Sequence, residues 1–234
     1  MKLKLIPTLA LTALSIGSVA NAAITVQQHL TFNDNAAPAG FSNTLGSASY
    51  SGGQIVLDGD SYISGPSGLA TTDNIGFEVI ATGTTFGTFQ FPIAVNEGSS
   101  DNVGLGILEE SGWKGIVQGQ IVITPAAASS TGVETRLAFV RADGTNNFYV
   151  NGVLVSTNGN APGGADLDTL HIGANPFDGA AGGFTGSINE VRTFSFNSGE
   201  FATSDLLTGA TVPEPSSSAL LGLGGLALVL RRRK

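Results

Sequence analysis

The chain has 234 residues, of which 41% are hydrophobic and only 12% charged, with 33 glycines and no cysteine. The absence of cysteine excludes a disulfide framework, a thiol nucleophile and a cysteine-ligated metal. Residues 23–211 carry four basic and 17 acidic side chains, a formal net charge of -13, because the other six basic residues lie in the terminal segments. Such an acidic body repels phosphate backbones and argues against nucleic-acid binding.

The N-terminus has the three parts of a secretory signal peptide. Two lysines near the start are followed by an apolar stretch over residues 5–19 and by small residues at Ala20 and Ala22. A basic start, an apolar segment and an A-x-A site are recognised and cleaved during export. We therefore predict that residues 1–22 are removed and that the mature chain begins at Ala23.

The body of the chain is predicted to consist of strands throughout. Short apolar or alternating segments are separated by Gly, Asn, Asp, Ser and Pro, and none shows a sustained helical period. A dozen short strands without helices predict an all-β fold of two packed antiparallel sheets, a β-sandwich. The expected strands are 24–32, 54–57, 75–81, 88–95, 103–108, 115–118, 120–124, 135–141, 147–150, 153–156, 169–172 and 186–196.

One hairpin has a particularly clear signal. Asn151 and Gly152 lie between the apolar segments 148–150 and 153–155. An Asn-Gly pair suits a type I′ turn, in which both central residues adopt positive φ. By contrast, residues 125–132 are rich in Ala and Ser and are expected to form a surface loop.

The order of segments around this hairpin resembles a known family. Residues 136–144 lead into the hairpin, residues 170–176 follow it, and residues 184–194 read Phe-Thr-Gly-Ser-Ile-Asn-Glu-Val-Arg-Thr-Phe. With residues 57–63, this succession resembles the concanavalin A-like, laminin-G-like (LamG) jelly roll, although Asn189 replaces an Asp of the family pattern. The resemblance implies a LamG-like domain over residues 23–197. It says little about activity, because this fold hosts lectins, adhesion modules and glycoside hydrolases.

The body offers no constellation typical of an enzyme. Retaining glycosidases need two carboxylates about 5–5.5 Å apart, but the adjacent Glu109 and Glu110 would point to opposite faces of a strand. His29 and His171 both lie in strand-like segments, where a single histidine is more often packed or exposed than catalytic. No phosphate-binding or nucleophile motif occurs in a suitable context. We therefore expect no catalytic residue.

Calcium is the one cofactor for which the body offers ligands. Ca²⁺ takes six to eight oxygen ligands, and LamG-like domains often carry such a site at the rim of a sheet. No contiguous calcium-binding loop is present, so the individual ligands stay undefined. The candidate loops are Asp58–Asp60, Glu97–Asn102, Asp166–Asp168 and Asn175–Asp178.

Two further side chains have alternative interpretations. Trp113, the only tryptophan, follows Glu109–Gly112 in an expected loop. It either packs in the core or is exposed and contacts a ligand by stacking on a sugar ring. Arg192 on the last expected strand is predicted to pair with Glu190 or with an acid on the next strand.

The C-terminus begins with a polar connector and ends in a three-part tail. Residues 198–211 are predicted to be an exposed linker, with a short helical turn near Asp205. Val212, Pro213, Glu214 and Pro215 then precede a glycine-interrupted apolar segment of 12 residues, 219–230, and a basic cluster of Arg231, Arg232, Arg233 and Lys234. A stable membrane-spanning helix needs about 20 apolar residues, so this short transmembrane segment favours temporary anchoring in the inner membrane, with the basic cluster as its membrane stop.

The tail, residues 212–234, closely resembles the PEP-CTERM sorting signal of Gram-negative bacteria that produce exopolysaccharide. The resemblance implies an exosortase partner that cuts near Pro213–Pro215, and delivery to the cell surface or extracellular matrix. We predict a secreted protein whose LamG-like module binds carbohydrate, such as exopolysaccharide or a surface glycan, or protein, without catalysis. The alternatives are a structural matrix protein without a specific ligand and, least favoured, a glycan-active enzyme on the same fold.

Overall fold

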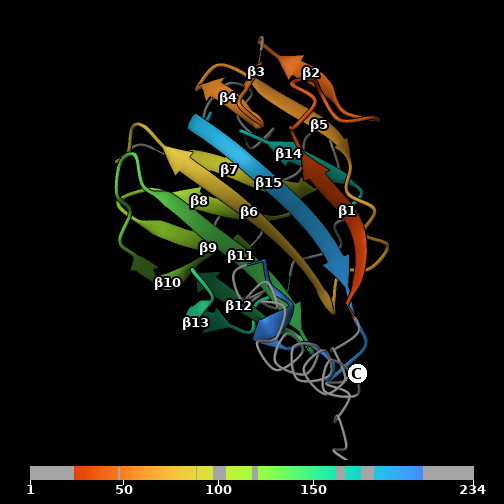
Figure 1. The fold of residues 1–234 in the computed structure, drawn as a ribbon. Helices are drawn as coiled ribbons and strands as arrows, with labels where there is room; N and C mark the ends of the chain where they lie inside the picture. Colours follow the sequence, from red (N-terminus) through yellow and green to blue (C-terminus); the bar gives the residue numbers. More distant parts are fainter. Residues whose placement is uncertain are drawn as a thin grey trace, which may run out of the picture.

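The polypeptide folds into two antiparallel sheets packed face to face (Figure 1). The computed structural model describes residues 24–46, 48–87, 89–96, 104–117, 121–161, 167–174 and 182–207. Within these ranges, fifteen strands are followed by one short 3-10 helix, η2 (Thr203–Asp205). The strands are β1 (Thr25–Thr31), β2 (Ser42–Leu45), β3 (Ser49–Ser51), β4 (Gln54–Asp58), β5 (Tyr62–Pro66), β6 (Ile75–Gly83), β7 (Gln90–Asn96), β8 (Gly104–Glu109), β9 (Trp113–Val117), β10 (Ile121–Ala127), β11 (Glu134–Ala142), β12 (Thr145–Val150), β13 (Val153–Asn158), β14 (Thr169–Ile172) and β15 (Thr185–Ser195).

The strand order interleaves distant parts of the chain. In the described residues, the eight-stranded sheet has the order β13-β12-β11-β6-β15-β4-β3, with β1 also paired to β15, and the seven-stranded sheet has the order β10-β9-β8-β7-β14-β5-β2. The last strand, β15, pairs along one edge with β6 and along the other with both β1 and β4. The predicted all-β sandwich with jelly-roll connections is confirmed.

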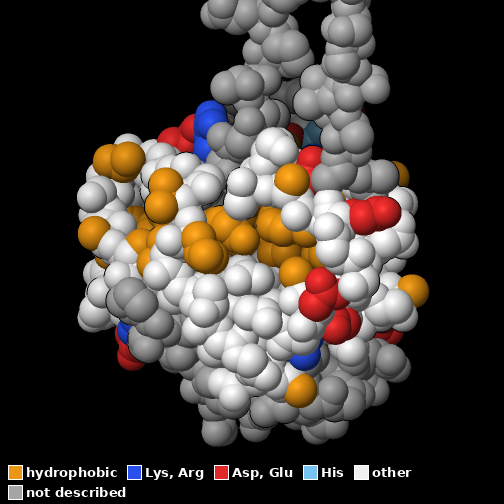
Figure 2. Space-filling model, turned by 90° about the horizontal axis from the view of Figure 1, so that it is seen from below, with side chains coloured by type: hydrophobic (Ala, Val, Ile, Leu, Met, Phe, Trp, Pro, Cys, Tyr) orange, Lys and Arg blue, Asp and Glu red, His pale blue; other side chains and the backbone are white. Residues whose placement is uncertain are grey.

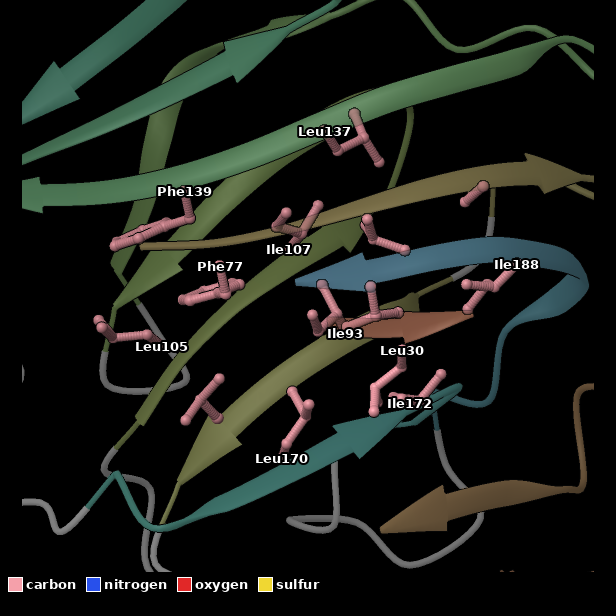
Figure 3. Packing of buried hydrophobic residues seen from close by; sticks show 14 of the residues in the cluster. Leu30, Phe77, Ile93, Leu105, Ile107, Leu137, Phe139, Leu170, Ile172 and Ile188 are labelled. Atoms are coloured by element: carbon pink, nitrogen blue, oxygen red, sulfur yellow. The ribbon is translucent and has the colours of Figure 1, made fainter. Parts of the chain in front are cut away.

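The core lies between the sheets and is formed by alternate side chains of both (Figure 3). Because successive side chains of a strand point to opposite faces, every second residue of a central strand is available to the core. Phe77 of β6 and Phe139 of β11 stack with ring centroids 5.1 Å apart. Ile93 and Ile107 of the opposite sheet are fully buried in the same cluster. Burial of this apolar surface supplies the main stabilisation in a chain without disulfides.

Most expected strands are present, but three short ones were missed. Strands β2 and β3 are rich in Ser and Asn, and β5 ends in Gly65 and Pro66, so each has too short a succession of β-branched and aromatic residues to mark a strand. The expected loop over residues 125–132 is wrong at its start, because residues 125–127 belong to β10. The Asn-Gly hairpin is confirmed: Asn151 and Gly152 connect β12 and β13 with φ of 51° and 79°.

The prediction of an exposed linker is wrong at residues 201, 202 and 205–207, which are buried or half-buried, while residues 198–200, 203 and 204 are exposed as predicted. Residues 197–207, here called the C-terminal strap, pack on the outer face of the eight-stranded sheet. Leu206 is fully buried, and Phe201 is partly buried against Tyr149 and Phe196. Most of the other residues of this segment are small or polar, so its overall composition gave no sign that Phe201 and Leu206 pack on the sheet. The expected helical turn near Asp205 corresponds to η2.

The predicted processing signals lie outside the described residues. This applies to Ala20, Ala22 and Ala23 at the signal-peptide site, to the motif 212–215, to the apolar segment 219–230 and to the basic cluster 231–234. Among the residues that are described, no helix is long and apolar enough to span a membrane.

Candidate functional site

A row of paired residues crosses the outer face of the seven-stranded sheet. Ser64 of β5 pairs with His171 of β14, and His171 pairs with Ala94 of β7. The row continues through Gly106 of β8 to Ile116 of β9. On β14, β7 and β8, the residues before and after each member of this row belong to the core. Because successive side chains of a strand point to opposite faces, the row itself points away from the core. The row thus has a polar end at His171 and an apolar end at Ile116. The two residues between them, Ala94 and Gly106, have little or no side chain.

The polar end of this row is organised around His171. Its Nε2 lies 2.9 Å from Oδ1 of Asn96, and the ring of Tyr62 lies 6.1 Å away. The histidine is only 2% exposed, and its Nδ1 has no hydrogen-bond partner among the described residues. Because Nε2–H donates to the asparagine oxygen, Nδ1 of the neutral ring is an acceptor. The site therefore presents a buried acceptor that a ligand hydroxyl or a water can satisfy.

Burial fixes the charge state of this imidazole. Desolvation lowers the pKa of His171 to about 4, and the carboxylate of Asp168 offsets this only in part. The ring is therefore uncharged at neutral pH. A neutral acceptor next to an aromatic ring suits an uncharged polar ligand rather than an anion.

The titration of His171 predicts a pH-dependent stability. The folded-state pKa lies below the ordinary 6.5, so the unfolded chain binds more protons between these values. The contribution of His171 to the free energy of unfolding is then complete above pH 6.5 and falls as the pH drops towards 4, by at most about 3 kcal/mol. Denaturation of the wild type and of His171→Gln at several pH values measures it. A constant difference between the two proteins from pH 4 to 7 would contradict the assignment.

The apolar end of the row is built from Phe91, Leu108 and Ile116, which form a small buried cluster of their own. Phe89 packs edge-on against Phe91 with ring centroids 4.9 Å apart and is itself 39% exposed. The backbone N–H of Phe91 donates to the carbonyl of Gly182, and Gly183 forms a parallel bridge with Phe91, so the segment before β15 runs beside β7 here. Phe89 is thus an exposed aromatic ring beside this face, and the sequence did not single it out.

Trp113 is not the exposed ligand contact that was considered above. It begins β9, paired with Glu109 and Ala127, and its side chain points into the core, where it is fully buried. Its indole packs edge-on against Phe86 at 5.4 Å and lies 6.4 Å from Phe184. No sugar can stack on this ring, and the alternative of a packed core residue holds.

The two adjacent glutamates point to opposite faces, as predicted. Glu110 is exposed and pairs with Lys114 at 3.2 Å. Glu109 is fully buried, and its carboxylate accepts hydrogen bonds from the backbone N–H groups of Gly87 and Gly112 and from the hydroxyl of Ser129, at 3.0–3.1 Å. Glu109 therefore ties three segments together, and the two carboxylates do not form a reactive pair.

The calcium prediction rests on four loops, of which only the turn at Asp58 is fully described. Asp58 accepts hydrogen bonds from Ser61 Oγ and the Asp60 N–H, which lower the pKa of its carboxyl and close the turn between β4 and β5. The loop 97–102, Asp166 and the loop 175–178 lie outside the described residues. Where side chains are described, no three His, Asp or Glu residues come together as metal ligands. Bound Ca²⁺ stays a prediction.

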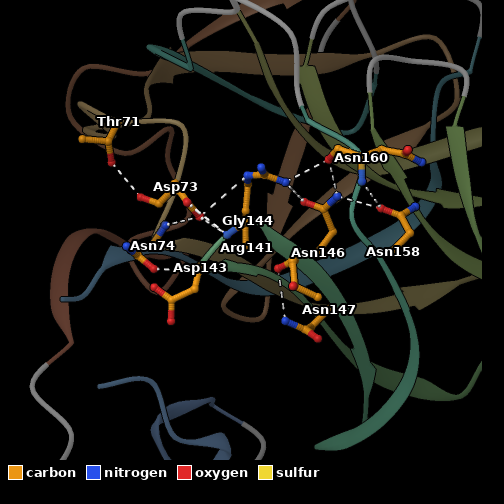
Figure 4. A network of polar contacts seen from close by, with 11 residues as sticks. Thr71, Asp73, Asn74, Arg141, Asp143, Gly144, Asn146, Asn147, Asn158 and Asn160 are labelled. Atoms are coloured by element: carbon orange, nitrogen blue, oxygen red, sulfur yellow. Dashed lines mark hydrogen bonds and ion pairs between the residues drawn. The ribbon is translucent and has the colours of Figure 1, made fainter. Parts of the chain in front are cut away.

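A polar network closes one end of the sandwich (Figure 4). The guanidinium of Arg141 donates to Oδ1 of Asn146 and to the carbonyl of Asn160, both at 2.8 Å. Asn146 in turn donates to Oδ1 of Asn158 at 2.7 Å. Nε of Arg141 lies 3.7 Å from a carboxylate oxygen of Asp73. Because these groups largely satisfy one another, we interpret the network as structural.

A buried ion pair lies on the outer face of the eight-stranded sheet. Arg192 of β15 donates from Nε to Glu78 of β6 at 2.5 Å, which confirms the predicted pairing with an acid on the next strand. Glu78 is 1% exposed, and burial raises the pKa of its carboxyl to about 7, although Arg192 and a backbone N–H act in the opposite direction. This pair also contacts the C-terminal strap.

An apolar surface lies at the end of the molecule viewed in Figure 2, where hydrophobic side chains form a band. On the edge strand β13, Val153 and Leu154 are 65% and 48% exposed. Exposed apolar surface of this kind is typical of contacts with apolar partners. The row around His171, which combines polar and aromatic groups, is the stronger candidate for a polar ligand.

Comparisons with known proteins agree with this architecture. Residues 57–197 match the family model described as the concanavalin A-like lectin/glucanases superfamily, and residues 211–234 match the PEP-CTERM protein-sorting motif. No curated protein matches the sequence.

Two solved structures illustrate the similarity of the fold. Domain 4 of AbnA, a GH43 extracellular arabinanase from Geobacillus stearothermophilus, solved with arabinotriose, is 20% identical with a TM-score of 0.59; the match covers 78% of this chain and 98% of that one. Trypanosoma rangeli sialidase, solved with sialic acid, is 16% identical with a TM-score of 0.58; the match covers 81% of this chain and 34% of the sialidase. The present chain thus corresponds to about a third of the sialidase.

Proposed function

Because the chain belongs to the concanavalin A-like lectin/glucanases superfamily, we propose that its sandwich is a non-catalytic module that binds glycans. The PEP-CTERM motif at residues 211–234 identifies a secreted or cell-surface protein of a Gram-negative bacterium and implies processing by an exosortase. The family contains both lectin-like domains and glycoside hydrolases, so the choice of binding over catalysis depends on the site itself.

The observation that carries the proposal is the unpaired Nδ1 of His171 next to Asn96 and Tyr62. A buried acceptor without a partner costs free energy, which a sugar hydroxyl can recover by donating to it. The ring of Tyr62 lies beside it, 8% exposed, as an apolar neighbour for a bound ligand. Ala94 and Gly106 add little side-chain volume beside it, and Ile116 and Phe91 pack against Gly106.

Charge favours a neutral glycan. The body carries four basic and 17 acidic side chains, and its field opposes the approach of sugars that carry a carboxylate. The imidazole of His171 adds no positive charge, because its pKa is about 4. We therefore propose an uncharged polysaccharide or oligosaccharide as the ligand.

A binding assay tests the proposal. The purified protein is applied to an array of neutral and acidic glycans, with and without Ca²⁺, and arabinotriose and sialic acid serve as probes because they occur in the two similar structures. We expect saturable binding to neutral glycans and none to sialic acid. Binding to no glycan at all would favour the structural matrix protein, and release of reducing ends from polysaccharide would show an enzyme.

Substitution of His171 is expected to weaken this binding. His171→Gln removes the imidazole acceptor, and the loss of one hydrogen bond to a ligand hydroxyl predicts about tenfold weaker affinity. His29→Gln is the matched control, because His29 is the exposed histidine on the opposite sheet, where it pairs with Glu190. Isothermal titration on both variants, after a melting curve to verify folding, gives the comparison. Equal affinities of the two variants would remove His171 from the site.

A further inference from the structure

The C-terminal strap connects the folded body to the sorting motif, and it is fixed on the sheet at several points. Near its start, the N–H of Gly199 donates to a carboxylate oxygen of Asp143 at 3.2 Å. In its middle, Phe201 lies 6.3 Å from Phe194 in a stacked arrangement. Near its end, Leu206 is buried in a cluster with side chains of β11 and β12. The strap is therefore part of the folded domain.

The buried ion pair fixes the last residues of the strap. Glu78 accepts a hydrogen bond from the backbone N–H of Leu207 at 2.7 Å, through the carboxylate oxygen that does not face Arg192 Nε. Arg192 donates to the backbone carbonyl of Asp205. Both members of the pair thus bind backbone groups of the strap. Because Glu78 is almost fully buried, these bonds form away from solvent and are strengthened by the low local dielectric.

This attachment limits the distance between the body and the cleavage region. Pro213 of the sorting motif is six residues after Leu207, so a fully extended chain separates them by at most about 21 Å. If the strap detached from the sheet, the last attached residue would be Ser195, 18 residues before Pro213. A fully extended chain between these two residues spans at most about 65 Å. The length of free chain between the folded body and the sorting motif, here called the tether, is therefore short when the strap is attached and long when it is detached.

We infer that the strap regulates the processing of the tail. When it is closed, it keeps the folded, acidic body next to the sorting motif, where the body restricts access by the membrane-bound processing peptidase. An anionic membrane surface also repels a body with 17 acidic side chains against four basic ones. Opening the strap lengthens the tether, relieves this restriction and accelerates cleavage. The inference is independent of any glycan ligand.

Pulse–chase labelling of the full-length protein in its exosortase-bearing host tests the inference. The main variant carries a 12-residue Gly/Ser insertion directly after Leu207, which lengthens the tether and leaves the strap, the ion pair and residues 212–234 intact. We expect its tail to be removed at least about threefold faster than that of the wild type, because a flexible linker of this length extends the reach by tens of ångströms. Cleavage at the wild-type rate, or more slowly, would overturn the inference.

A second variant tests the role of the ion pair. In Glu78→Ala, hydrogen exchange at the Leu207 amide should become faster, and cleavage should accelerate as in the insertion variant. Glu109→Ala is the control, because it destabilises the fold at the opposite sheet without touching the strap. Equal acceleration in Glu109→Ala would show that general unfolding is responsible, and would contradict a role for the strap contacts.

Discussion

Replacing Trp113 with alanine is expected to lower the free energy of unfolding by about 3–5 kcal/mol, the range for removing a large buried aromatic side chain. The indole is fully buried and packs against Phe86 and Phe184. The loss combines the transfer free energy of the ring with the cost of the cavity that it leaves. Equilibrium denaturation followed by far-UV circular dichroism measures the change.

The matched control for this substitution is Phe89→Ala. Phe89 is also aromatic but 39% exposed, so its removal leaves no closed cavity and should cost about 1 kcal/mol or less. Similar losses for the two variants would mean that Trp113 does not have the buried position described. If the folded fraction of Trp113→Ala binds glycan with the same affinity as the wild type, the indole has a purely structural role.

Breaking the buried ion pair is expected to have an effect of the same size. Glu78→Ala leaves the guanidinium of Arg192 without its carboxylate partner, and removal of one member of a buried pair typically costs about 3–5 kcal/mol. The double variant Glu78→Met, Arg192→Met should recover most of this loss, because no buried charge is then left uncompensated. Chemical denaturation at pH 8, where Glu78 with its pKa of about 7 is mostly ionised, measures both.

A surface pair provides the contrast. Glu110 and Lys114 are four residues apart and pair at 3.2 Å, with the Glu110 side chain 49% exposed, so Glu110→Ala should change stability by less than about 1 kcal/mol.

The pH dependence of stability gives an independent check on the Glu78–Arg192 pair. Because folding raises the pKa of Glu78 above its ordinary value of 4.5, the folded state binds more protons between these values, and the contribution of Glu78 to stability falls as the pH rises from 4.5 to 7. A double variant no more stable than Glu78→Ala would refute the ion-pair explanation.

The parts of the fold that depend on local signals were predictable from the sequence. The Asn151–Gly152 turn requires two residues that tolerate positive φ, and the segment 169–172 is a strand with the predicted bounds. Short polar edge strands such as β3 have no such signal, because hydrogen bonding to β4, and not their composition, makes them strands. Local sequence therefore defined the apolar strands, including the edge strands β10 and β13, better than the short polar ones.

The candidate site depends on pairings between distant residues. His171 meets Asn96 across 75 residues, and Glu78 meets Arg192 across 114. Which residues face each other follows from the register of β7 with β14 and of β6 with β15, and a slip of one residue would move each side chain to the other face. The small residues at positions 94 and 106 are visible in the sequence, but that they lie side by side next to His171 follows only from the strand pairing.

The pairing of the first strand with the last has a consequence for the order of events during biogenesis. Strand β1 pairs with β15, some 160 residues later, and β15 also supplies the partner of β4 and of one edge of β6. Closing contacts over such sequence separations is slow and must wait until both strands are available. The eight-stranded sheet therefore cannot be completed until residue 195 has crossed the membrane, when the sorting tail at residues 211–234 follows closely behind. This topology delays completion of the fold until the part of the chain next to the sorting tail is available.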